Sequence, residues 1–128
     1  MIDHEITSKE GVRREMLTAK SRIEFIEEDK LQYQDMKNNL ENNIIPKLTA
    51  AKNWILNAKE KLTKSYTGQE SQTRCKSLES NSEEIEKVIN VIKKCIIPKI
   101  KTELISLNSQ LNELNTDYET LKKMYENW

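Results

Sequence analysis

The sequence predicts an all-α protein, folded as an antiparallel hairpin of two long helices. Three observations indicate this class. The chain has only 2 glycines and 2 prolines in 128 residues, so it can form few tight turns. Apolar residues recur three or four positions apart through both halves of the chain, whereas period-two alternation never persists. One short stretch, around Gly68, combines glycine with several small polar residues.

The first helix is expected to run from about residue 5 to residue 65. Its apolar residues fall mostly three or four positions apart, which places them on one face of a helix. Lys61 and Lys64 suit the negative end of the helix dipole. The predicted apolar stripe consists of Met16, Ile23, Ile26, Tyr33, Met36, Leu40, Ile44, Leu48, Ala51, Ile55, Ala58 and Leu62.

The turn is expected at about residues 66–72. Gly68 is predicted to be the C′ residue of the first helix, because glycine adopts a left-handed conformation without a Cβ penalty. The second helix is expected at about residues 73–126. Its N-cap could be Ser71 or Thr73, with a competing start at Asn81 or Ser82.

The second helix has the more regular pattern, with steps close to a heptad repeat. Its charged residues fall between the apolar positions. The predicted stripe consists of Leu78, Ile85, Val88 or Ile89, Ile92, Ile96, Ile100, Leu104, Leu107, Leu111, Leu114, Tyr118, Leu121, Tyr125 and Trp128.

Pro46 and Pro98 interrupt the expected helices, and each follows a pair of isoleucines and precedes a lysine. Proline inside a helix removes a hydrogen bond and clashes with the preceding turn. The apolar stripe nevertheless runs past both prolines without a phase break. The preferred interpretation is therefore two kinked helices. The alternative is a fresh helix capped by Asn42-Asn43, which would give three or four helices.

Two helices alone cannot enclose a core, because each apolar stripe is only half covered by one partner. We therefore expect a single domain, residues 1–128, whose exposed apolar seam completes a four-helix bundle with a partner or a second copy. Tryptophan at a helix interface serves as a packing or a partner-binding anchor. The residues predicted to bind a partner are Trp54, Ile92, Ile96, Ile100, Leu104, Leu107, Leu111 and Trp128.

Charge and hydropathy argue against nucleic-acid and membrane functions. The chain has 21 basic and 21 acidic residues, and the two halves of the sequence are each nearly balanced. No basic stripe of the kind that nucleic-acid binding needs is apparent. No apolar run approaches the length of about 20 residues that a membrane span requires. The first 30 residues lack the pattern of a cleaved secretory signal.

Catalysis, metals and cofactors are not predicted. The chain has no glycine-rich phosphate loop and no paired residues that could activate a nucleophile. One histidine and two cysteines cannot form a zinc site. Cys75 and Cys95 would lie about 30 Å apart along one helix, so they cannot form an intramolecular disulfide. Two partly buried thiols are expected.

The segment Tyr66-Thr67-Gly68 between two long helices resembles the turn of the WXG superfamily of small helical hairpins, with Tyr66 in place of the usual tryptophan. The chain length and the Ile96-Ile97-Pro98-Lys99-Ile100 segment look most like the accessory proteins encoded beside LXG toxins of type VII secretion systems. The resemblance implies a chaperone-like partner for the helical LXG domain. Tyr66 and Gly68 are its turn-motif residues.

The same superfamily carries an export signal in which an acidic residue follows an aromatic residue by four positions. The usual place near the C-terminus departs from this pattern, because Lys122 follows Tyr118. Phe25 and Asp29 fit the spacing within the first helix, as do Tyr66 and Glu70 at the turn. Phe25 and Asp29 are therefore the candidate export-type motif.

The sequence predicts a non-catalytic binding module, and the resemblance implies that its partner is an LXG domain or a related small hairpin. The alternative is a structural coiled coil that works as a homodimer or larger homo-oligomer. The resemblance implies a cytoplasmic protein, or one exported by type VII secretion without a cleaved signal peptide.

Overall fold

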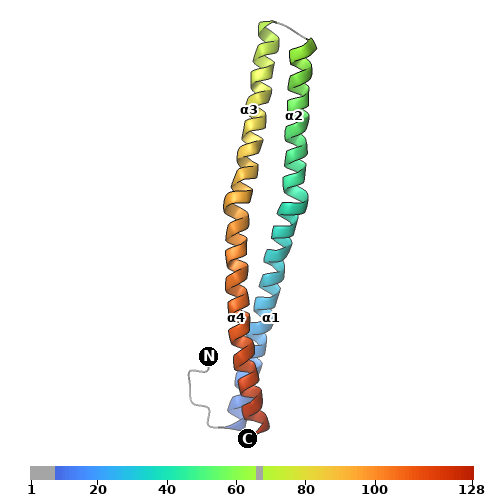
Figure 1. The fold of residues 1–128 in the computed structure, drawn as a ribbon. Helices are drawn as coiled ribbons and strands as arrows, with labels where there is room; N and C mark the ends of the chain where they lie inside the picture. The colour runs from blue at the N-terminus through green and yellow to red at the C-terminus, as the bar shows by residue number, and fades with distance from the viewer. Residues whose placement is uncertain (1–7, 66–67) are drawn as a thin grey trace. The chain divides into compact units, whose positions relative to one another are not determined.

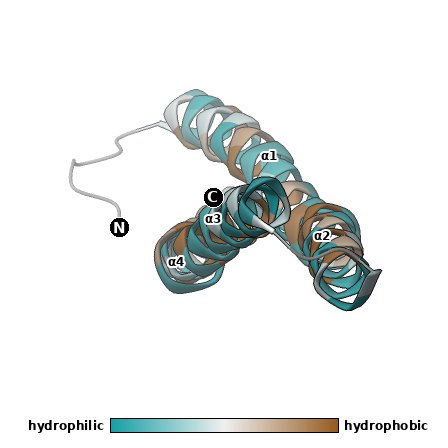
Figure 2. Cartoon of the chain, turned by 90° about the horizontal axis from the view of Figure 1, so that it is seen from above, coloured by the Kyte–Doolittle hydropathy of each residue, from teal (hydrophilic) through white to brown (hydrophobic). Residues whose placement is uncertain are grey.

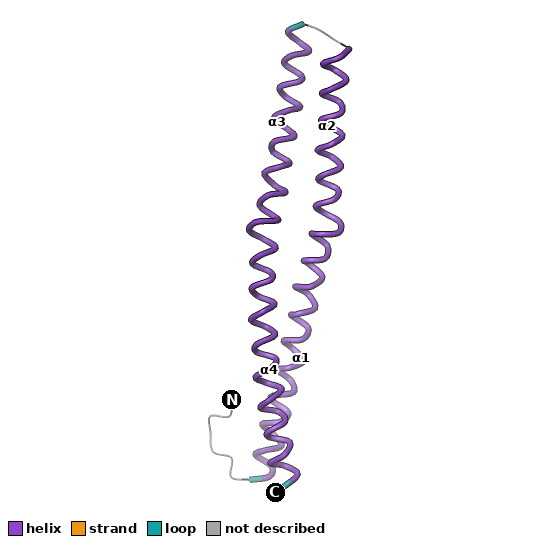
Figure 3. The backbone as a smooth tube through the Cα atoms, viewed as in Figure 1, coloured by secondary structure: helices purple, strands orange, loops and turns teal. Residues whose placement is uncertain are grey.

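The computed structural model describes residues 8–65 and 68–128. Within these ranges only Ser8, Gly68, Asn127 and Trp128 lie outside helices, and no strand is present (Figure 3). The all-α prediction is therefore confirmed. The elements in chain order are α1 (Lys9–Asn39), the π-helical turn η1 (Leu40–Ile44), α2 (Ile45–Ser65), α3 (Gln69–Val91), the π-helical turn η2 (Ile92–Ile96) and α4 (Ile97–Glu126) (Figure 1).

The chain divides into two compact units, each made of antiparallel helices. Unit 1 comprises residues 1–35 and 100–128, and it pairs most of α1 with most of α4. Unit 2 comprises residues 36–99, and it pairs α2 with α3. Since each unit joins a segment of the first long helix to a segment of the second, the predicted helical hairpin is confirmed. The prediction of one domain over residues 1–128 stays a prediction.

Helix α1 begins after a serine cap. The Ser8 hydroxyl oxygen accepts a hydrogen bond from the Gly11 N–H at 3.0 Å, and the Ser8 carbonyl accepts one from the Val12 N–H at 3.1 Å. These bonds satisfy donors that the first helical turn would otherwise leave unpaired. The predicted start at about residue 5 lies outside the described residues.

The turn is shorter than the sequence suggested. Helix α2 ends at Ser65 and α3 begins at Gln69, four residues before the expected start. Gly68 has the expected positive φ, with φ 123° and ψ 174°. This conformation is open only to glycine, but it is not the left-handed helical one, and it caps the start of α3. The predicted C′ role and the predicted caps at Ser71, Thr73, Asn81 and Ser82 are therefore wrong.

Each proline is the second residue of the α-helix that follows a π-helical turn. The N–H of Ile45 bonds to the Leu40 carbonyl, and the N–H of Ile97 bonds to the Ile92 carbonyl, each five residues back. The wider turn moves the preceding carbonyls away from the proline ring that follows, so the helix continues instead of ending. Asn42 and Asn43 lie inside η1, and no new helix is capped there.

The π-turn η2 shifts the buried face of the second helix by one position. Ile89 and Ile92 are buried, and the next buried residues are Ile97 and Ile100. The step from Ile92 to Ile97 is five residues, as a π-turn requires. Ile96 is consequently 38% exposed, and the prediction that the stripe passes both prolines without a phase break is wrong.

Unit 1 is held together by apolar and aromatic packing. Val12 and Ala19 of α1 form a buried cluster with Leu121 of α4. Met16, Tyr118, Met124 and Tyr125 cover this cluster. The Lys9 ammonium lies 4.6 Å from the centroid of the Tyr125 ring, in cation–π contact.

Unit 2 has a more polar interface. Helix α2 contains no fully buried residue, whereas α3 buries Ser82 and Ile89. Lys52 and Lys59 reach across to Glu86 and Glu79, at 2.7 Å and 3.3 Å. Met36 and Ala51 were predicted to lie on the apolar stripe, but both are exposed. The residue that follows each of them, Lys37 or Lys52, is half-buried instead. Those two assignments to the stripe are wrong because lysine stems can cover an apolar face.

Candidate protein-binding surfaces

Large apolar side chains remain exposed on both units. On α2, Trp54 is 71% exposed, and Trp128 at the end of the chain is 54% exposed. Figure 2 shows hydrophobic residues interspersed with hydrophilic ones on α1 and α2. The remaining large exposed apolar residues are Leu17, Phe25, Leu31, Met36, Leu56, Val88, Val91, Ile96 and Ile105.

Trp54 does not lie on the side of α2 that carries the ion pairs to α3. It follows Lys52 by two residues, which turns it about 200° around the helix. Lys52 faces Glu86 of α3, so Trp54 points away from that contact. Of the two roles considered for Trp54, packing within the hairpin is thus not seen among the described residues.

The predicted partner-binding residues of the second helix mostly serve the hairpin itself. Ile92, Ile100, Leu107 and Leu111 are buried, and Leu104 is half-buried. Ile96 and the terminal Trp128 are the exposed members of the set, at 38% and 54%. Sequence periodicity identified these residues as an apolar face, but it could not tell which helix covers them. The open choice between Val88 and Ile89 is resolved, since Ile89 is buried and Val88 is 48% exposed.

Unit 1 contains a groove of about 510 Å³ between α1 and α4. Its apolar middle is formed by Phe25 and Ile26 of α1 and by Leu107 of α4. Phe25 is 66% exposed, although it lines the groove, while Leu107 is buried at the bottom. A side chain of that size at a groove edge is available to a partner. The polar residues of the lining are Ser21, Arg22, Asp29, Glu103 and Gln110.

The two ends of this groove carry opposite charge. Because α1 and α4 are antiparallel, moving along α1 from Arg22 to Asp29 corresponds to moving along α4 from Gln110 to Glu103. Asp29 and Glu103 therefore share one end, while Arg22 and Gln110 share the other. Within the described residues, none of the ion pairs involves Arg22, Asp29 or Glu103. The groove is thus a bipolar site with an apolar centre.

The residues named by the family resemblance are only partly described. Tyr66 of the turn motif lies outside the described residues, and Gly68 caps α3. Phe25 and Asp29 of the export-type motif lie on α1 in unit 1, where both line the groove. Their spacing of four does place them on one helix face. Their role in export stays a prediction.

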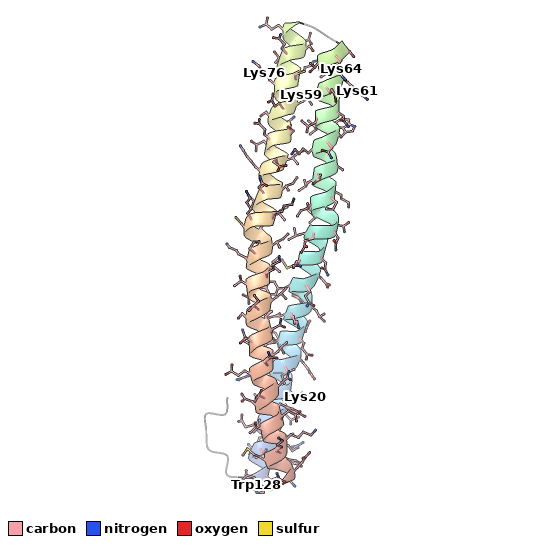
Figure 4. All side chains as sticks on the ribbon, in the orientation of Figure 1. Lys20, Lys59, Lys61, Lys64, Lys76 and Trp128 are labelled. Atoms are coloured by element: carbon pink, nitrogen blue, oxygen red, sulfur yellow. The ribbon has the colours of Figure 1, made fainter. Side chains whose placement is uncertain are left out.

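The fold separates charge that looks balanced in the sequence. Residues 36–99, which form unit 2, include 12 Lys and Arg and 7 Asp and Glu. The residues assigned to unit 1 include 9 Lys and Arg and 14 Asp and Glu. Unit 2 therefore has a net charge of +5 and unit 1 a net charge of −5. Lys59, Lys61, Lys64 and Lys76 all lie toward the end of unit 2 where α2 meets α3 (Figure 4). Counting by halves of the sequence concealed this separation, because each unit combines both halves.

Among the ionisable groups, Glu86 stands out. A hydrogen bond from Lys52 and the positive charge of that ammonium lower the pKa of the Glu86 carboxyl from its ordinary value. Both side chains are partly exposed. This pair therefore supports the α2–α3 contact and has no feature of an acid–base site.

The thiols and acidic residues give no sign of a metal site in the part of the chain that the structure describes. Cys75 is half-buried and Cys95 is exposed in η2, both as free thiols. The expectation of a partly buried thiol is thus wrong for Cys95. Within residues 8–65 and 68–128 there is also no helix apolar enough to cross a membrane.

Comparisons with family models, with curated proteins and with solved structures find no match to this chain.

Proposed function

We propose that this protein is a non-catalytic binding module that packs exposed apolar side chains against the helices of a protein partner. The observation that carries the proposal is the exposure of large side chains that a finished bundle would cover. Trp54, Phe25 and Ile105 are 71%, 66% and 70% exposed. Aromatic side chains concentrate binding energy at interface centres. Apolar side chains on two paired helices can pack against additional helices, as in a four-helix bundle.

The partner we propose is the helical domain of an LXG-type toxin, with this chain as its accessory or chaperone-like partner in type VII secretion. This choice follows from the Tyr66-Thr67-Gly68 turn and the Ile96–Ile100 segment, and from the two long helices around them. No cofactor or metal is needed for such a role. The protein would act in the cytoplasm, or leave the cell with its cargo without a cleaved signal.

A second candidate function is self-association into a structural homo-oligomer. The observation that favours it is the bipolar groove of unit 1, whose acidic and basic ends could each meet the opposite end of another copy. Helical faces of this kind can be covered by a second hairpin as well as by a foreign helix.

The first proposal is tested by co-expressing this chain with the helical domain of an LXG protein and recovering the complex by affinity capture. We expect a soluble complex, and Trp54→Ala should reduce affinity by about tenfold or more if Trp54 anchors the partner. Asn53→Ala is the matched control, since Asn53 is an exposed polar residue beside Trp54 on α2 and is not one of the apolar side chains proposed to bind the partner. Failure to retain the LXG domain, with the purified chain forming a homodimer, would favour the second candidate.

A further inference from the structure

The bipolar groove of unit 1 is a surface feature outside the hairpin core that combines an exposed aromatic residue with charged side chains. Arg22, Phe25 and Asp29 follow one another at spacings of three and four, so they lie along one face of α1. Phe25 is exposed, and the three charged residues of the groove have no ion-pair partner within the described residues. An uncovered aromatic residue between opposite charges indicates a surface that is completed by another molecule.

The order of charges on α1 is self-complementary. Arg22 and Asp29 are seven residues apart, or about 10.5 Å along the helix, and the midpoint between them falls between Phe25 and Ile26. If a second α1 lies antiparallel across a twofold axis at that midpoint, Arg22 of each copy faces Asp29 of the other. Phe25 of each copy then faces Ile26 of the other. A twofold interface needs this reciprocity, in which residue i meets j and j meets i.

Helix α4 reinforces the same arrangement. Glu103 lies at the Asp29 end of the groove, so an incoming Arg22 meets two carboxylates. Leu107 forms the bottom of the groove at the level of Phe25, where an incoming phenylalanine ring would be covered. Along the groove the order is therefore basic end, apolar centre, acidic end. An antiparallel α1 of a second copy presents the opposite charge at each of these ends and apolar side chains at the centre.

We propose that the groove of unit 1 binds the same groove of a second copy, with α1 antiparallel to α1 across a twofold axis between Phe25 and Ile26. This inference rests on the second candidate function, self-association, and names its contact. The contact uses one groove and one helix face per copy, so it falls in the class of small interfaces that form weak dimers.

The experiment measures the mass of the full chain by sedimentation velocity over a concentration series from about 5 to about 500 µM, which covers micromolar dissociation constants. We expect a reversible monomer–dimer equilibrium. Phe25→Asp should leave a monomer throughout, because two carboxylates would enter the apolar centre. Leu31→Asp is the matched control, since Leu31 is 60% exposed on α1 but does not line the groove, and it should dimerise as the wild type does.

Charge reversal tests the register. Arg22→Asp alone and Asp29→Arg alone should each weaken dimerisation by about tenfold or more, since like charges then face each other. Mixing the two single variants should restore a dimer that contains one copy of each. The circular dichroism of every variant at low concentration checks that the helices are intact.

Three results would overturn the proposal. One is a wild-type chain that stays monomeric across the series. Another is dimerisation that is as strong in Phe25→Asp as in Leu31→Asp. The third is a mixture of the charge variants that dimerises no better than either alone. A monomer that still retains an LXG domain would refute this contact and leave the first proposed function standing.

Discussion

The two units use the same helical pairing but different chemistry to hold it. Unit 1 joins α1 to α4 through Val12, Ala19 and Leu121, with methionine and tyrosine side chains around them. Unit 2 joins α2 to α3 with no fully buried residue on α2, and lysine–glutamate pairs cross the interface instead. Exposed or half-exposed ion pairs contribute little to stability, whereas buried apolar side chains contribute much. Unit 1 should therefore be the more stable part of the hairpin.

The largest expected effect is the loss of a buried leucine in unit 1. Leu121 is 3% exposed, so Leu121→Ala should lower the free energy of unfolding by about 2–5 kcal/mol. Leu62→Ala in unit 2 removes the same atoms from a half-buried position and should cost clearly less. Chemical denaturation of both variants measures the difference. Equal losses would show that the two interfaces are packed alike.

A second comparison uses the adjacent isoleucines at η2. Ile97 is 7% exposed and Ile96 is 38% exposed, so Ile97→Ala should cost about 2–4 kcal/mol and Ile96→Ala substantially less. The pair is well matched, because the residues are identical and neighbouring. If Ile96→Ala proved the more damaging of the two in thermal unfolding, the five-residue step at η2 would be wrong.

The turn of unit 2 should show a smaller effect. Gly68→Ala is expected to lower the free energy of unfolding by about 1–3 kcal/mol, because its backbone conformation is open only to glycine. Nothing lies within 4 Å of the position that a Cβ would take, so the cost comes from the backbone alone. A melting temperature equal to that of the wild type would refute this account of the turn.

The smallest effect concerns the Lys52–Glu86 pair. Because the folded-state pKa of Glu86 is lowered, the contribution of this carboxylate is fully present above the ordinary pKa of a glutamate and is lost as the pH falls through the lowered pKa. Glu86→Gln should therefore be slightly less stable than the wild type at pH 7, and the difference should shrink toward pH 3. Denaturation at both pH values measures it. A difference that grows on acidification would contradict the sign of the pKa shift.

Much of the fold followed from the sequence, since regular apolar spacing and scarce glycine and proline predict long helices. The buried face of α4 from Ile100 onward was predicted correctly for the same reason. The shift at Ile96 was missed, because proline signals a disturbed helix without showing that a π-turn accommodates it. Half-buried Lys52 was missed because its partner, Glu86, lies on the other helix.

The surfaces were less predictable than the fold. Trp54 and Phe25 were singled out from the sequence, but the groove depends on which residues of α4 lie beside α1. Arg22, Glu103 and Gln110 were not recognised, and no local pattern marks Glu103 or Gln110. The charge separation between the units likewise appears only when residues are grouped by unit. A scan for Arg and Asp seven residues apart around an aromatic residue could have found Arg22.

The most direct test of the difference between the units is native-state hydrogen exchange of the unmodified full chain, read by mass spectrometry. Amides in α1 and α4 within unit 1, such as those near Ala19 and Leu121, should exchange more slowly than amides near Leu62 in α2 and Cys75 in α3. The reason is that more buried apolar side chains lie in unit 1 than in unit 2. Among the described residues unit 2 buries only Ile89, Ile92 and Ile97 in this way, and its other contacts across the helices include solvated ion pairs. Slower exchange in α2 and α3 than in α1 and α4 would contradict the account.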